Sequence, residues 1–384
     1  MTAGDPTLQM QVQQALAQRN APAALALLRE AEAAAPADID IKMQKAMALR
    51  MSGDTHGAID ALDQALALEP YNFVALLSKG ALIERTLGMR QAAAIYRNAL
   101  KLLPVEPPPA FLGAIARARQ VIDETTDALA AYLQAKTTGL GLHLDTASQA
   151  RFDEGLQIFA GKTRPYVSEA LLLTYPRLPA IPFHDRSLFP WFAELEAATD
   201  IIREELEGAL AQDEKDFAPY IAYRPGDPVN QWGELNHSRR WSSYFLWKDG
   251  ARQDAACDRC PRTAALLDQI PMARQPGFAP TAMFSALDAH THIPAHTGST
   301  NTRLLVHLPL ILPGPARFRV GNETRSWEMG QAWAFDDTIE HEAWNDADKL
   351  RVILIIDIWN PYLTEAEREL VTEMMTARNQ YFAG

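Results

Sequence analysis

A repeat of 34 residues constrains the first third of this 384-residue chain more strongly than any other feature. Pro36, Pro70 and Pro104 are spaced 34 residues apart, and each closes a run rich in alanine and leucine. Small residues at fixed places let helices pack closely, and proline ends a helix because it lacks a backbone N–H. The period therefore predicts a stack of helix pairs. The alanines in register with it are Ala24, Ala58 and Ala92, followed by Ala31, Ala65 and Ala99.

This pattern resembles the tetratricopeptide repeat over about residues 3–104. Residues 108–137 are interpreted as one further, degenerate helix pair. The resemblance implies an all-α domain over residues 1–137, and a helical connector is expected over residues 138–180. Two roles stay open for the repeats. They could form a spacer that solubilises or dimerises the protein, or a concave groove that binds a peptide or protein partner.

Length and charge narrow the classes of function. A chain of this length can bury substantial cores, and we expect two domains, with three as the alternative. The formal net charge of −12 disfavours a nucleic-acid partner, because sequence-independent binding requires neutralisation of phosphates. No apolar stretch reaches the roughly 18–20 residues of a membrane helix, and the N-terminus lacks the pattern of a secretory signal. We therefore expect a cytoplasmic protein without a membrane span.

The two cysteines, Cys257 and Cys260, lie in the sequence Cys-Asp-Arg-Cys. They amount to half of a zinc site, and no second pair is present to complete it. We interpret them as ordinary loop thiols, with a disulfide or redox role as the alternative.

The composition changes near residue 181, where a domain over residues 181–384 is expected to begin. Residues 191–211 predict one amphipathic helix. Beyond residue 228 the chain becomes rich in β-branched and aromatic residues, which predicts an α+β domain built on a barrel. The clearest strand-like runs cover residues 302–312, 316–320, 331–335 and 351–359.

Two histidines near these runs are the strongest indication of a catalytic site. His296 precedes them and His341 lies between the last two, so a folded-back sheet could bring both imidazoles to one non-haem iron. Arg351 begins a strand whose next five residues are aliphatic, and a buried guanidinium without a partner is costly. A dicarboxylate ligand would supply that partner. The alternative is an ion pair with Asp336 or Asp357.

Side chains alternate between the two faces of a strand, so the runs at 302–312 and 351–359 each predict a set of side chains that share one face. The first set is Arg303, Leu305 and His307, and the second is Arg351, Ile353, Ile355 and Asp357.

Several ordered blocks between about residues 230 and 361 resemble the aspartyl/asparaginyl β-hydroxylases. This family consists of Fe(II)- and 2-oxoglutarate-dependent dioxygenases with a double-stranded β-helix (jelly-roll or cupin) core. A tetratricopeptide arm also fits the family. The resemblance implies an enzyme that uses Fe(II), 2-oxoglutarate and O2. The blocks are His-Thr-Gly-Ser-Thr-Asn-Thr-Arg at 296–303, His-Leu-Pro-Leu at 307–310, and those at 321–327, 335–337, 341–346 and 351–361.

The resemblance also assigns roles to residues. His296 and His341 would bind the iron. Most enzymes of this chemistry add a carboxylate two residues after the first histidine, where this chain has Gly298. The family shares that glycine, so water would complete the metal shell. Arg351 and Ser285 would hold the distal carboxylate of 2-oxoglutarate.

Three further positions follow from the same resemblance. His307 would contact the carboxylate end near the metal, and Trp241 would line the cosubstrate pocket. The family commonly carries arginine where this chain has Leu305, so Arg303 could replace it or could face the prime substrate. The acidic pair at 336–337 could orient a ligand histidine or hold a turn.

The sequence leaves three functions open. The first is hydroxylation of Asp or Asn side chains in a peptide or protein, presented by the helical arm. The second is the same chemistry on a lipid, a free amino acid or a small metabolite. The third is a non-catalytic interaction protein, for which Leu305 is the only hint. Candidates for contacting an acidic substrate are Arg239, Arg240, Arg303 and Arg325.

Overall fold

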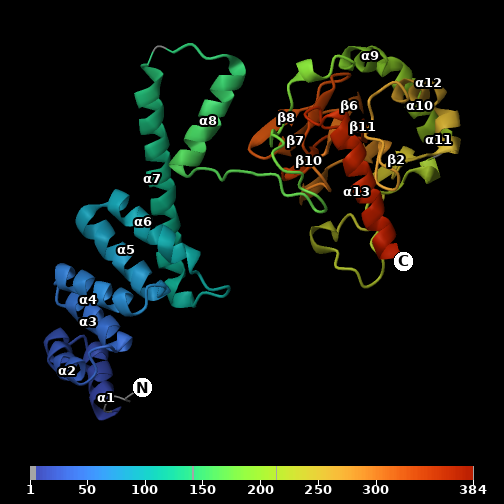
Figure 1. Cartoon of the computed structure of the whole chain (residues 1–384). Helices are drawn as coiled ribbons and strands as arrows, with labels where there is room; N and C mark the ends of the chain where they lie inside the picture. Colours follow the sequence, from blue (N-terminus) through green and yellow to red (C-terminus); the bar gives the residue numbers. More distant parts are fainter. Residues whose placement is uncertain (1–5, 141, 213, 384) are drawn as a thin grey trace. The chain divides into compact units, whose positions relative to one another are not determined.

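The computed structural model describes residues 6–140, 142–212 and 214–383. The chain divides into two compact units, Met1–Arg164 and Pro165–Gly384, and the division falls inside the predicted connector. The first is called the helical unit and the second the sheet unit (Figure 1). Each buries hydrophobic clusters of its own.

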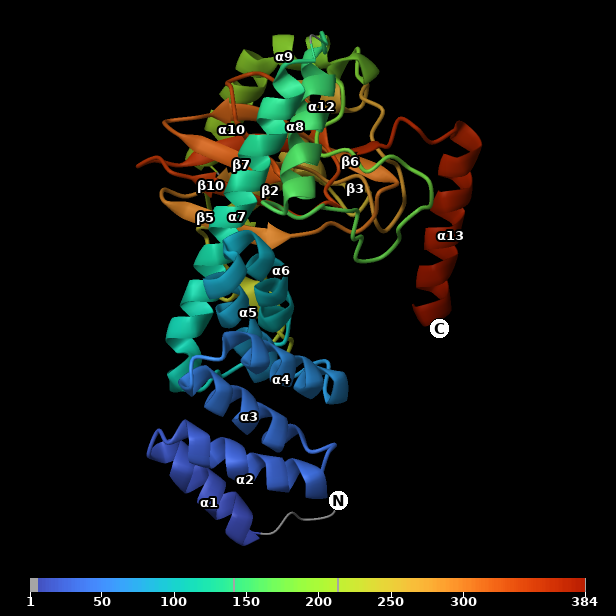
Figure 2. The same cartoon turned by 90° about the vertical axis from the view of Figure 1, so that its left-hand side faces the viewer.

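The helical unit has the repeat architecture that the 34-residue period predicts. Ala24, Ala58 and Ala92 are all fully buried where neighbouring helices pack. Figure 2 shows α1 to α6 as successive layers. The helices are α1 Pro6–Ala17, α2 Ala21–Ala34, α3 Ile39–Met51, α4 Thr55–Leu68, α5 Phe73–Leu87, α6 Met89–Lys101, α7 Leu112–Thr138 and α8 Thr146–Ala160, with a 3-10 turn at Pro109–Phe111.

One prediction for this unit was wrong. Residues 108–137 form no helix pair, because α7 continues without a break from Leu112 to Thr138. Neither proline nor glycine occurs between Gly113 and Gly139, so nothing in the sequence ends the helix. Its buried stripe packs on the cluster shared with α5 and α6.

Gly80 of α5 is expected to be intolerant of a larger side chain. A Cβ there would lie 2.6 Å from ring carbons of Tyr96 on α6. Tyr96 is buried and its hydroxyl donates to Glu84 at 2.8 Å, so the ring cannot swing away. Gly80→Ala should lower the free energy of unfolding by about 1–3 kcal/mol, measured by urea denaturation. Gly155→Ala in α8 meets no atom within 4 Å and should be neutral or stabilising by up to about 1 kcal/mol. Equal losses in the two variants would contradict this account.

The sheet unit holds two antiparallel sheets. The large one has the order β1-β2-β4-β11-β6-β9, with β3 paired to β2, and the small one has the order β5-β10-β7-β8. From β4 to β11 the chain alternates between the two sheets, except at the β7–β8 hairpin, which stays in the small sheet, and the strands enclose one core as in a double-stranded β-helix. The predicted fold class is confirmed. The bounds are β1 Ala218–Pro219, β2 Trp241–Lys248, β3 Ala251–Arg252, β4 Ala282–Leu287, β5 Thr291–His296, β6 Arg303–Ile311, β7 Ala316–Val320, β8 Glu323–Ser326, β9 Trp333–Phe335, β10 His341–Asn345 and β11 Arg351–Trp359.

Helices cover the outer face of the large sheet. The amphipathic helix predicted at 191–211 is broken in two at Ala198, a correction with a local cause. The hydroxyl of Thr199 donates to the carbonyl of Glu196 at 2.6 Å and competes with the helical ladder. The helices are α9 Phe192–Ala197, α10 Thr199–Gln212, α11 Asp254–Arg259 and α12 Pro261–Leu267, followed after the last strand by α13 Glu365–Ala383.

The interpretation of the cysteines also needs correction. Cys257 is not a loop thiol but lies on α11, while Cys260 occupies the bend between α11 and α12, and both are buried in the core against the large sheet. Separately, none of the helices described here has the length and apolar run that crossing a bilayer requires.

Candidate active site

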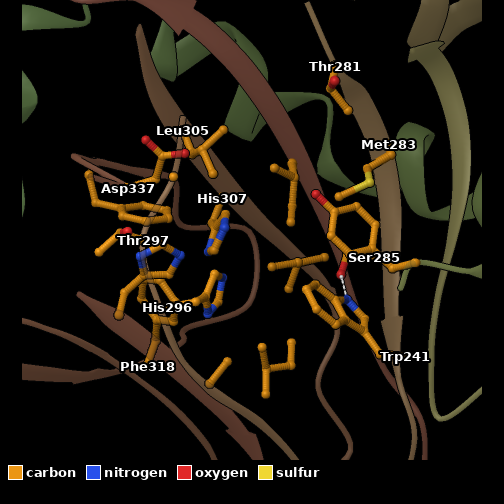
Figure 3. A pocket seen from close by; sticks show the side chains of 18 of the residues that line it. Trp241, Thr281, Met283, Ser285, His296, Thr297, Leu305, His307, Phe318 and Asp337 are labelled. Atoms are coloured by element: carbon orange, nitrogen blue, oxygen red, sulfur yellow. Dashed lines mark hydrogen bonds between the residues drawn. The ribbon is translucent and has the colours of Figure 1, made fainter. Parts of the chain in front are cut away.

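A cavity of about 290 Å³ lies in the core between the two sheets (Figure 3). Three strands of the large sheet line it through alternate side chains, which confirms the predicted faces. These are Met283 and Ser285 from β4, Arg303, Leu305 and His307 from β6, and Arg351, Ile353, Ile355 and Asp357 from β11. His296 and His341 join them from the small sheet.

The two histidines predicted to bind iron lie side by side. They are register partners on β5 and β10, and their ring centroids are 4.1 Å apart. Each Nδ1 pairs with a carbonyl oxygen two residues earlier, that of Pro294 at 2.8 Å and that of Ile339 at 3.0 Å. A carbonyl only accepts, so each Nδ1 carries the proton and each Nε2 keeps a lone pair for a metal.

Burial keeps both imidazoles in this neutral form. It lowers the pKa of His296 to about 4 and that of His341 well below its usual value. Neutral imidazole is the form that binds a metal. In the part of the chain that is described, no third His, Cys, Asp or Glu completes a cluster able to hold an ion.

Arg351 is a buried cation without an anion. Its side chain is 1% exposed, and no carboxylate lies within ion-pairing distance among the residues described. Among the described residues its guanidinium has one hydrogen-bond acceptor, the carbonyl of Ser285 at a long 3.5 Å, and it stacks over Trp327 at 4.6 Å. Burial lowers the pKa of Arg351 to about 9. The alternative partners do not serve it: Asp357 pairs with Arg303, and Asp336 accepts hydrogen bonds from Thr338.

Trp241 and Ser285 lie in the same corner as Arg351. The indole Nε1 of Trp241 donates to the hydroxyl oxygen of Ser285 at 3.1 Å, as Figure 3 shows. Because that bond occupies a lone pair of the oxygen, the hydroxyl proton of Ser285 stays free to donate elsewhere. A guanidinium and a hydroxyl donor therefore converge where an anion would be stabilised.

His307 is a third neutral imidazole in the cavity. It is buried against Phe318 and Phe335, and its Nδ1 has no hydrogen-bond partner. Burial and the nearby charge of Arg351 lower its pKa well below the usual value. It can donate or accept a hydrogen bond toward a ligand without adding charge.

Arg303 lines the cavity but is already paired. Its Nη1 donates to Asp357 and to the carbonyl of Phe278, each at 3.0 Å. At the position near His307 where the family commonly carries an arginine, this chain has the apolar Leu305. Arg303 lies two residues back on the strand, held by a carboxylate.

Asp337 occupies a place that the sequence did not reveal. A Cβ on Gly298 would overlap its carboxyl group, so the glycine makes room for this acid beside the histidine pair. Burial raises the pKa of Asp337 to about 8, and one of its oxygens has no hydrogen-bond partner. Asp336 instead holds the turn through Thr338. Another lining residue that the sequence analysis missed is Leu171, whose N–H donates to the carbonyl of Gly298.

The fit between Gly298 and Asp337 can be tested by a double-mutant cycle. Gly298→Ala alone should lower the free energy of unfolding by about 1–3 kcal/mol, because the new methyl group meets the carboxyl group. In an Asp337→Ala background the same change should cost much less. Thermal and urea denaturation of the four proteins measures the coupling. A cost that is the same in both backgrounds would show that the two residues do not compete for this space.

Comparison with known proteins agrees with this geometry. Residues 196–361 match the sequence pattern of the aspartyl/asparaginyl beta-hydroxylases. An ornithine lipid ester-linked acyl 2-hydroxylase from Rhizobium tropici is 37% identical over 202 residues, covering 52% of this chain and 68% of that protein. The chain belongs to the aspartyl/asparaginyl β-hydroxylase family. This assignment confirms the prediction of a hydroxylase made from the sequence blocks.

Other relatives of the family overlap less. The human aspartyl/asparaginyl beta-hydroxylase is 40% identical over 136 residues, which cover 35% of this chain but only 18% of that protein. The helical unit is similar to the Arabidopsis OM64 TPR domain, with 22% identity and a TM-score of 0.27 over 30% of this chain and 93% of that one.

Proposed function

We propose that this β-hydroxylase family member is an Fe(II)- and 2-oxoglutarate-dependent hydroxylase whose metal is held by His296 and His341. The observation that supports this most is the combination of two imidazoles with free Nε2 atoms and the unpaired cation of Arg351 in one cavity. A metal takes the former and a dicarboxylate the latter.

The residues around the histidines divide the work. Arg351 and Ser285 bind the distal carboxylate of 2-oxoglutarate, and Trp241 fixes the hydroxyl of Ser285 for that contact. His307 faces the other end of the cosubstrate as a neutral hydrogen-bonding group. With Fe(II), the cosubstrate and O2 supply the oxidant that turns a C–H into C–OH and release succinate and CO2. The protein binds and orients the cosubstrate and the substrate, and it excludes bulk water from the site.

Asp337 is suited to holding water at the metal. Its unpaired oxygen lies beside Gly298, the position from which other enzymes of this chemistry supply a carboxylate ligand. A carboxyl group there can accept a hydrogen bond from a water that completes the metal shell.

The names of the relatives offer two substrate classes, Asp or Asn residues and the acyl chain of a lipid. Both substrate classes are among those that the sequence left open.

For the helical unit we propose a protein partner. A groove of about 500 Å³ runs between α3, α4, α5 and α7, and an extended segment could lie along it. Among the residues that line it are Met43, Met47, Arg50, Leu77 and Phe111.

Succinate release tests the proposed reaction. The purified protein should convert 2-oxoglutarate to succinate in the presence of Fe(II), ascorbate and O2, even slowly without a prime substrate. Omission of Fe(II) with added EDTA should stop the release. Binding of 2-oxoglutarate, followed calorimetrically with Mn(II) in place of iron, gives a readout independent of turnover. Absence of both succinate and binding would contradict the proposal.

A further inference from the structure

Tryptophan and tyrosine side chains form a continuous line from the proposed metal site to the protein surface. The ring of Trp232 lies edge-on to that of His296, with the two centroids 4.9 Å apart. The ring of Trp241 follows at 5.8 Å from Trp232, and that of Tyr220 at 4.3 Å from Trp241. These four rings are called the aromatic line. Its two tryptophans are buried, whereas Tyr220 is 40% exposed, so the line ends in solvent.

Backbone hydrogen bonds fix the order of these rings. Trp241 begins β2, and its carbonyl accepts the N–H of Tyr220 at 3.0 Å, which places the two side chains next to each other. Trp232 ends a 3-10 turn, and its carbonyl accepts the N–H groups of Leu235 and Asn236, each at 2.8 Å. The spacing of the aromatic line is therefore set by the fold and does not depend on a ligand.

The other histidine of the site has different neighbours. The rings nearest to His341, apart from His296, are those of Phe335 and Phe318, at 5.3 and 5.8 Å. Beyond Phe318 lie Trp327 and then Trp333, and both indoles are buried. A phenyl ring gives up an electron far less readily than an indole or a phenol. Among the ring contacts of the described residues, the aromatic line is thus the better path for an electron between solvent and the metal site.

Such a path has a use in a hydroxylase of the proposed kind. An oxidant that forms while no substrate C–H bond is in place reacts with whatever lies nearest. Met283 and Trp241 both border the cavity (Figure 3), and thioethers are readily oxidised to sulfoxides. Prevention of side reactions is one of the tasks of the protein around a reactive group.

We propose that the aromatic line delivers electrons from a one-electron reductant in solution, such as ascorbate, to the metal site when no prime substrate is oxidised. The inference rests on the proposed function. Trp232 gives one electron toward the metal, and Trp241 and then Tyr220 replace it. Tyr220 releases its hydroxyl proton to water as it gives up the electron, and a hydrogen atom from ascorbate restores the phenol.

Two such transfers complete the balance. One oxygen atom of O2 enters succinate as 2-oxoglutarate loses CO2. The other oxygen atom becomes water by taking up two electrons and two protons. Ascorbate thus supplies the two electrons that a substrate C–H bond would have supplied.

The aromatic line can be tested in the full-length protein without metal. Light-driven oxidation by tris(bipyridyl)ruthenium(II) and persulfate attacks exposed side chains, and the wild type should pass the oxidation inward to the buried Trp232. Tyr220→Phe keeps the ring and removes the phenol. It should lower oxidation of Trp232, measured by mass spectrometry, about tenfold relative to Trp344, because the oxidant has no other access. Thermal denaturation should show an unchanged fold. Equal oxidation of Trp232 in the two proteins would overturn the inference.

Turnover without a prime substrate gives the second readout. With Fe(II), 2-oxoglutarate, ascorbate and O2, Tyr220→Phe should accumulate oxidised Trp232 and Met283 about tenfold faster than the wild type. Trp344→Phe removes an indole outside the aromatic line and should behave as the wild type. Succinate release with equal damage in Tyr220→Phe and the wild type would overturn the inference alone. Absence of succinate from the wild type would refute the proposed function, and the inference would fall with it.

Discussion

Replacing His341 with alanine is expected to abolish iron-dependent release of succinate, with a fall of at least about 100-fold, or about 2.7 kcal/mol. The reason is the small number of protein ligands. The ring centroids of His341 and His296 are 4.1 Å apart, and both imidazoles are neutral with a free Nε2 atom. Among the described residues that line the cavity, no other two histidines are placed in this way. A site with one histidine left cannot hold Fe(II) against water. Titration of Mn(II) or Co(II) should show the loss of binding directly.

His292→Ala is the matched control for this variant. His292 lies on β5 as well, but its ring is exposed, stacks on Trp344 and pairs with Glu342 at 2.9 Å. Metal binding and succinate release should remain close to the wild-type values. If His341→Ala bound metal as well as His292→Ala does, the assignment of the metal site would be wrong.

Replacing Arg351 with methionine is expected to weaken 2-oxoglutarate by roughly 100- to 1,000-fold, or about 3–4 kcal/mol. The guanidinium is the one buried cation in the described cavity without a carboxylate partner, so the cosubstrate loses its main ionic contact. Methionine keeps much of the apolar stem that packs near Trp327. The Km for 2-oxoglutarate and calorimetric binding with Mn(II) measure the effect, and metal binding itself should persist.

The same variant should be at least as stable as the wild type when no ligand is bound. An unpaired buried cation destabilises the fold, as the lowered pKa of about 9 for Arg351 indicates. Replacing such a group by an apolar one is often neutral or stabilising by about 1–4 kcal/mol. Arg317→Met removes an arginine paired with Asp346 at the surface and should leave the affinity for 2-oxoglutarate unchanged. A large loss of stability in Arg351→Met would mean that its guanidinium is structural.

Periodic features of the fold could be predicted from the sequence because the size and polarity of a residue indicate whether its position is buried. The alanines at the 34-residue spacing predicted the packed faces of the helical unit, and Ala24, Ala58 and Ala92 are fully buried. Likewise, the alternation along β6 and β11 predicted that Arg303 and Arg351 point into one cavity. The same local logic failed at α7 and at Ala198. There the length of a helix depends on a missing breaker or on a single hydroxyl hydrogen bond.

The sequence by itself determined the two-part architecture, the family and the set of chemical groups available to the site. Only the tertiary structure decided how these groups are paired. Arg303 meets Asp357, 54 positions away, and Asp337 fills the space that Gly298 leaves open. These pairings leave Arg351 as the buried cation without a carboxylate partner among the described residues of the cavity. Periodicity records which face of an element is buried. The partner of a buried charge is set by contacts between strands that are distant in the chain, and no local pattern encodes them.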